Sequence, residues 1–338
     1  MAEDRLIVRR GLLGLAALAA LGACSSAPPP APKPPLEPLP ALPLDRLVPR
    51  AGLDWLVRAS PRAIAQVPWL IPAVARIVPE TNFDGFREKL GFDLRQVPEA
   101  ILARHGEPLS CGTAYVRHNA DPLVLQKKLE KRLTSDVVRS EDRPDLARVS
   151  GRLGTEPRAF ARIGRDVAVY QQGGLGGRGT ARIATLYALK KLDARPALDG
   201  DPLAPLVARF GDAPAVAVAL VPFDDEWKQA ARGLLEVATA VGAAARPTAR
   251  EHVGLAIALS GEFGERGSEA ADTLRDAWGD LASSGTGRVL GLDRPIETPV
   301  AAGTRAVVTV SVELDADRLT EGLRALVAQD LDAIMRLE

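Results

Sequence analysis

The sequence predicts an α+β protein with a largely antiparallel sheet or sheets and amphipathic helices packed on one face. Segments in which apolar residues alternate with small or polar ones are typical of half-buried strands. Several of these segments lead into a capping residue and then a helix with one apolar stripe. Hydrophobic residues make up 46% and charged residues 25% of the chain, which are ordinary values for a globular protein.

Residues 1–23 have the pattern of a signal peptide. Three arginines within residues 1–10 precede a run of only Gly, Leu and Ala over residues 11–23. The run is shorter than the ~20 residues that a spanning helix needs, so it indicates an export signal. The pair Arg9-Arg10 faintly matches a twin-arginine signal, which leaves the general and the twin-arginine export routes both open.

The tetrapeptide Leu21-Gly22-Ala23-Cys24 closes this run and resembles the lipobox of bacterial lipoproteins. The resemblance implies that the thiol of Cys24 carries diacylglycerol and that a fatty acid such as palmitate anchors the chain. Each buried methylene of such chains contributes about 0.8 kcal/mol to membrane attachment. Ser25 follows where an aspartate commonly marks inner-membrane retention, so the resemblance implies outer-membrane delivery, facing the periplasm or displayed on the surface. The alternative is an ordinary secretory signal with an unmodified Cys24.

Residues 24–50 are predicted to be a tether. Prolines recur through this segment, and because proline fixes φ and lacks an N–H donor, we expect a semi-extended polyproline II spacer. A ligand of the PxxP type is the alternative.

Residues 51–195 are predicted to be an N-terminal α+β half that begins with a small helical region. In that region Thr81 or Asn82 can cap a helix. The expected elements are that helix with Phe83, Phe86 and Leu90 on one face, a strand over 113–118, a helix from Asp121-Pro122, strands over 160–163 and 167–170, and a helix over 181–192.

Residues 196–338 are predicted to be a C-terminal α+β half of strand-helix units. The expected strands are 216–220, 253–260 and 308–314, each followed by a helix that starts near Asp224, Ser268 or Asp315. The spacing of about 45 residues between these units would fit two related halves.

The lipobox, the proline tether, the run from Gly91 to Ala100 and the strand-helix units together resemble uncharacterised lipoproteins of Gram-negative bacteria. They are more distantly similar to envelope domains of unknown function. That resemblance implies no catalytic residues.

Charge and cysteine content exclude two classes of protein. Lys plus Arg equals Asp plus Glu at 43 each, which argues against a nucleic-acid partner. With Cys24 lipidated, Cys111 has no second cysteine to pair with, so a structural disulfide is excluded. We expect Cys111 to be a buried small side chain, with a catalytic nucleophile as the alternative.

The histidines do not predict a metal or catalytic site. His105, His118 and His252 lie beyond helical reach of one another, and no zinc motif is present. Cys111 and His118 would lie on opposite faces of one strand, ~23 Å apart, which separates a thiol from its candidate base.

Three further motifs have ordinary structural explanations. Gly174–Gly179 matches G-x-G-x-x-G but lacks the second strand of a dinucleotide fold, which favours a flexible turn over an anion nest with Arg178. Ser283–Gly287 is expected in a loop rather than a nucleophile elbow. The acids Asp224-Asp225-Glu226 are expected to stabilise a helix start.

The sequence therefore predicts a non-catalytic binding or scaffolding lipoprotein, with no metal and no cofactor besides the lipid on Cys24. Its expected partners are the membrane, through that lipid, and an envelope protein. Two alternatives stay open: a carrier or chaperone for a hydrophobic molecule, and a hydrolase in which His252 or His118 meets a distant nucleophile.

Overall fold

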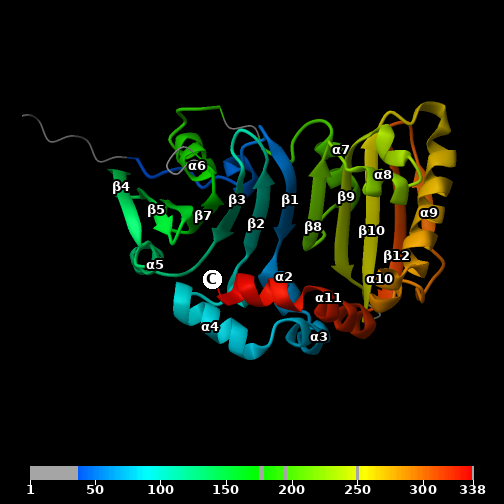
Figure 1. The fold of residues 1–338 in the computed structure, drawn as a ribbon, viewed down its shortest axis with the longest axis horizontal. Helices are drawn as coiled ribbons and strands as arrows, with labels where there is room; N and C mark the ends of the chain where they lie inside the picture. Colours follow the sequence, from blue (N-terminus) through cyan, green and yellow to red (C-terminus); the bar gives the residue numbers. More distant parts are fainter. Residues whose placement is uncertain (1–36, 175–178, 194–195, 249–250, 337–338) are drawn as a thin grey trace, which may run out of the picture. The chain divides into compact units, whose positions relative to one another are not determined.

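One 12-stranded antiparallel sheet runs through the protein in the order β11-β12-β10-β9-β8-β1-β2-β3-β7-β6-β5-β4 (Figure 1). The computed structural model describes residues 37–336 except 175–178, 194–195 and 249–250. Residues 39–338 form one compact unit. The predicted α+β class with an antiparallel sheet is confirmed.

The strands are β1 (Leu53–Ala59), β2 (Glu99–His105), β3 (Cys111–Arg117), β4 (Ser135–Arg143), β5 (Leu146–Leu153), β6 (Glu156–Ile163), β7 (Val167–Gly173), β8 (Ala215–Leu220), β9 (Ala238–Pro247), β10 (His252–Gly261), β11 (Val300–Gly303) and β12 (Val307–Asp315).

The two halves of the sheet follow the same path outward from the centre. One half has the order β1-β2-β3-β7-β6, with β5 and β4 added at its edge, and the other has the order β8-β9-β10-β12-β11. β1 and β8 pair antiparallel and join the halves. The predicted division at residues 195 and 196 falls in the connection that carries the chain from one half to the other.

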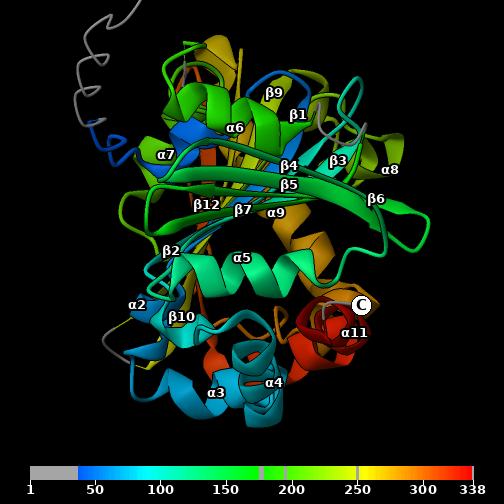
Figure 2. The same cartoon turned by 90° about the vertical axis from the view of Figure 1, so that its left-hand side faces the viewer.

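Helices cover both faces of the sheet, whereas the sequence predicted a helical layer on one face. In Figure 2, α6 and α7 lie above the strands and α5 lies below them, so we call these the upper and lower faces. The prediction was wrong because the strands were expected to be half-buried, whereas the small residues on their second side are buried as well. On β6, Ala159 and Ala161 are buried above while Phe160 is buried below. The helical segments are η1 (Leu44–Leu47), α2 (Pro61–Ala65), α3 (Leu70–Ile77), α4 (Glu80–Leu90), η2 (Leu94–Gln96), α5 (Pro122–Glu130), α6 (Thr180–Ala188), α7 (Leu203–Phe210), α8 (Asp225–Ala230), η4 (Leu234–Glu236), η5 (Gly264–Arg266), α9 (Gly267–Ser283), α10 (Gly285–Val289) and α11 (Ala316–Arg336).

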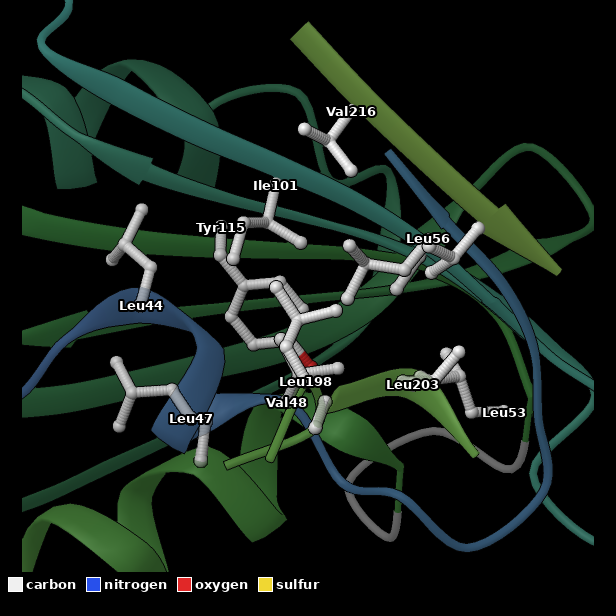
Figure 3. Close-up of a cluster of buried hydrophobic side chains, with 14 of the residues drawn as sticks. Leu44, Leu47, Val48, Leu53, Leu56, Ile101, Tyr115, Leu198, Leu203 and Val216 are labelled. Atoms are coloured by element: carbon white, nitrogen blue, oxygen red, sulfur yellow. The ribbon is translucent and has the colours of Figure 1, made fainter. Parts of the chain in front are cut away.

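The upper face holds a large apolar core that includes the end of the predicted tether. Leu44, Leu47 and Val48 are buried against Ile101 and Tyr115, as Figure 3 shows. The tether was expected to extend to residue 50, but residues 39–50 belong to the folded unit. The apolar residues between the prolines are the reason, because burying one large side chain contributes about 1.5–3 kcal/mol.

Capping side chains begin several helices at the residues that the sequence indicated. The carboxylate of Asp121 accepts hydrogen bonds from the N–H groups of Leu123 and Val124 at 2.8 and 3.0 Å, which starts α5. Asp224 caps α8 in the same way. Thr81 and Asn82 were wrong as caps, because both lie inside α4, which follows Pro79.

Candidate functional site

In the part of the chain that the structure describes, the lower face of the sheet carries helices at its two sides but not across its middle. On one side, α4 and α5 bury Phe86, Leu125 and Phe160. On the other side, α9 buries Trp278 against β12. α3 and α11 pack on each other and enclose Val253 with Leu70 near the strand ends. Between these clusters, Figure 1 shows the middle of β1, β2 and β8 with no helix in front of it.

Strand register identifies the side chains that share this uncovered area. Opposite residues on antiparallel neighbours project to the same face. Trp55 pairs with Arg104, while Leu102 pairs with both Val57 and Ala114. Val57 also pairs with Ala217, which in turn pairs with Ala243. We define the open face as Trp55, Val57, Leu102, Arg104, Ala114, Ala217 and Ala243.

Burial separates the open face sharply from the opposite side of the same strands. Trp55 and Leu102 are each 42% exposed, and no member of the open face is buried. On the upper side, the adjacent residues Leu56 and Ile101 are both 0% exposed. The strands are therefore apolar on both faces but buried on only one. Exposed contiguous apolar surface of this kind marks binding sites more often than isolated apolar residues do.

A β-bulge at the start of β1 turns Trp55 onto the open face. Leu53 pairs with His105 and Trp55 pairs with Arg104, so two steps on β1 oppose one step on β2. The additional residue, Asp54, lets Leu53 enter the upper core while Trp55 projects downward. Without the bulge, Leu53 and Trp55 would share one face.

Arg104 is the single charged member of the open face. It lies beside Trp55 in the strand register and is exposed. Among the described residues, no carboxylate forms a salt bridge with its guanidinium. The open face thus combines apolar area with one positive charge that has no salt bridge within the described part of the chain.

Cys24 and Ser25, the predicted lipidation and sorting residues, lie outside the described residues.

Cys111 is buried, and its Sγ lies 3.9 Å from Thr113 Oγ1 and 3.7 Å from Thr180 Oγ1. Those two hydroxyls lie 2.5 Å apart. Burial raises the pKa of the nearby Tyr115, so this phenol stays protonated at neutral pH. Among the described residues, the side chains within hydrogen-bonding distance of the Cys111 thiol are the hydroxyls of Thr113 and Thr180.

Gly179 directly precedes α6, and residues 175–178 of the glycine-rich motif, including Arg178, lie outside the described residues. Gln171 caps that helix: its Oε1 accepts from the N–H of Ala181 at 3.1 Å, and its Nε2 donates to Gly173 O at 3.0 Å. A Cβ on Gly179 would lie 2.2 Å from Gln171 Nε2, so the glycine makes room for this cap. The next strand, β8, pairs with β1 and β9 rather than running parallel to β7, so no dinucleotide-binding unit forms.

The structure places the three histidines apart. His105 is buried above the sheet with Nε2 2.8 Å from Pro49 O, and His118 stacks below it on Phe92. His252 lies on β10 with Nδ1 3.5 Å from Glu313. Cys111 contacts α6 residues above the sheet, so the predicted separation of Cys111 from His118 onto opposite faces is confirmed.

The remaining motif residues act at helix starts. The Oγ of Ser284 accepts from the N–H of Gly287 at 3.0 Å, so the Ser283–Gly287 segment joins α9 to α10 instead of forming the expected loop. Asp225 and Glu226 lie in the first turn of α8. Within the described ranges, no group of three or more His, Cys, Asp and Glu side chains could hold a metal ion, and no helix has the length and apolarity to cross a membrane.

Comparison with known proteins found no matching family model, no matching curated protein and no matching solved structure.

The open face was not predicted from the sequence. Its one local signal was the run Ala100-Ile101-Leu102-Ala103, in which apolar residues occupy both faces of a strand. Such a run predicts that something covers each face.

Proposed function

We propose that this protein is a lipid-anchored envelope protein that binds another protein through the open face and catalyses no reaction. The main support for this proposal is the open face, where Trp55 and Leu102 on neighbouring strands are exposed to water. A partner that covers Trp55 and Leu102 would gain on the order of 1 kcal/mol from each. Aromatic residues and arginine are enriched at protein interfaces, and the open face contains Trp55 and Arg104.

The lipobox supports the location. Cys24 would carry the lipid, Ser25 would permit outer-membrane delivery, and the protein would face the periplasm or, alternatively, the cell surface. The prolines before residue 39 would hold the folded unit away from the bilayer.

A protein partner fits the open face better than a hydrophobic small molecule. Small-molecule sites are concave and bury 70–90% or more of their ligand, whereas a sheet face covers a ligand from one side. The hydrolase alternative needs a histidine beside a nucleophile, and neither His118 nor His252 has a hydrogen bond to a described Ser, Thr or Cys side chain.

Metabolic labelling with a palmitate analogue tests the anchor. Wild-type protein is expected to carry the label and to sediment with outer membranes, while Cys24→Ala is expected to lose the label and enter the soluble fraction. Cys111→Ala is the matched control and should label like the wild type. Undiminished label in Cys24→Ala would contradict the anchor.

A further inference from the structure

The open face leaves room for a further helix in the lower layer. α5 packs on β6 and α9 packs on β11 and β12. Between them, the open face runs from Ala114 on β3 across β2, β1 and β8 to Ala243 on β9. Neighbouring strands lie about 4.8 Å apart, so these two positions are about 19 Å apart. A helix with its side chains is ~10–12 Å wide, and it would fit here.

Backbone hydrogen bonding favours a helix over an extended segment. β1, β2 and β8 already pair with a strand on each side, so an incoming strand has no ladder to join on the open face. An extended chain laid flat on these side chains would leave its own N–H and C=O groups without partners as water is excluded. A helix satisfies its backbone internally.

The residue sizes and the charge specify the face that such a helix would present. Ala114, Ala217 and Ala243 leave shallow positions beside the larger Trp55 and Leu102. Large apolar side chains of a helix can fill these positions, because packing improves where large and small residues face each other. Arg104 requires an acidic residue opposite it. A second copy of this chain supplies no acid from its own open face, so self-association through that face would leave Arg104 unpaired.

We propose that the open face binds an amphipathic helix of a partner protein. Large apolar residues of that helix contact Ala114, Ala217 and Ala243, and an Asp or Glu pairs with Arg104. This inference rests on the proposed function and specifies the partner's binding element.

Site-specific photo-crosslinking tests the inference in cells that make the full-length lipidated protein. The photoreactive residue p-benzoylphenylalanine would replace Leu102 on the open face. As a matched control it would replace Val138, which is 63% exposed on the edge strand β4. The expected adduct forms from position 102 and not from position 138. Mass spectrometry should map it to a protein segment with apolar residues at i, i+3 or i+4, and i+7, and with an acid one turn away.

Charge exchange completes the test. Arg104→Glu should reduce the adduct about tenfold or more, and changing the mapped acid of the partner to Lys should restore it. Arg104 is exposed, so the variant is expected to fold, and an unchanged circular dichroism spectrum would verify this.

The possible failures separate the inference from the proposed function. The helix inference would be overturned, with protein binding still supported, by a protein adduct that maps to an extended segment. An adduct whose yield does not change with Arg104→Glu or with the partner's acid-to-Lys change would have the same consequence. An adduct with a second copy of this chain would also overturn it. An adduct with phospholipid alone, or none from position 102 or from a second probe at Trp55, would overturn both.

Discussion

His105 and His118 are buried histidines whose environments disfavour their charged forms. His105 is 0% and His118 is 5% exposed, and burial lowers the pKa of both imidazoles. For His105, the hydrogen bond to Pro49 and the charge of Asp54 act in the opposite direction but are the smaller effects. For His118, the charge of Asp166 opposes the shift without reversing it.

The lowered pKa values predict loss of stability in mild acid. Below about pH 6.5 the unfolded chain binds protons at both positions while the folded protein does not. The free energy of unfolding should therefore fall as the pH drops through this value, by up to about 1.4 kcal/mol per pH unit for each histidine. Urea denaturation at a series of pH values between pH 7.5 and pH 5.5, a range of about two units, measures this slope.

His118→Phe supplies the control, because phenylalanine keeps the stacking on Phe92 but binds no proton. The variant should show a shallower decline than the wild type. Burial raises the pKa of Asp45 and Glu99, and their protonation in the folded state would oppose the decline, so the difference between the wild type and His118→Phe isolates the contribution of His118. Equal slopes in the two proteins would show that His118 titrates normally in the folded state.

At the scale of elements, α6 depends on a side chain from the preceding strand. Gln171 accepts from the N–H of Ala181 and donates to Gly173 O, and its side chain occupies the space that a Cβ on Gly179 would need. Gly179→Ala must therefore displace Gln171 and break the same hydrogen bonds that Gln171→Ala removes.

Because the two substitutions damage one interaction, their effects should not add. Each single variant should lose about 1–3 kcal/mol of unfolding free energy, since a buried helix terminus loses its partner. The double variant should lose much less than the sum of the two. Thermal or urea unfolding of the four proteins measures the coupling. Strict additivity would show that Gly179 and Gln171 act independently.

Sequence periodicity predicted those elements in which the side chains alternate clearly. β12 and its cap are an example, because Val308, Val310, Val312 and Leu314 are buried on one face and the carboxylate of Asp315 accepts from the N–H of Arg318 at 2.9 Å. β2 was not predicted, because Ile101, Leu102 and Ala103 are apolar on both faces and so show no alternation. Alternation in the sequence reports a chemical difference between two faces, and a strand that is apolar on both faces has none.

At the scale of the whole molecule, the candidate site depends on contacts that a local pattern cannot contain. Val57 and Ala217 are neighbours only because β1 pairs with β8, which lies far along the chain. The bulge at Asp54 then decides which face Trp55 occupies. Sequence reasoning could identify Cys24 from adjacent residues, and lipidation there stays a prediction. It could not identify the open face, because the fold alone shows which side of the central strands a helix covers.

The same β1–β8 pairing predicts that the two halves unfold together. The sheet continues across this pair, and Leu56 of β1 and Val218 of β8 share the upper core. Val218 is 3% exposed, so Val218→Asp places a charge in this core and should lower the urea midpoint of the whole protein. Ser311→Asp, at an exposed position on β12, should leave the midpoint nearly unchanged.

Hydrogen exchange in urea distinguishes this prediction from independent halves. Peptides from β6 in one half and β12 in the other should exchange through one opening event with equal free energy, and Val218→Asp should lower both values equally. If the halves were separate folding units, β6 would keep its wild-type protection in the variant while β12 lost it. Equal loss at both positions would mean that the central strand pair couples the halves, so the open face would form only when the whole sheet is assembled.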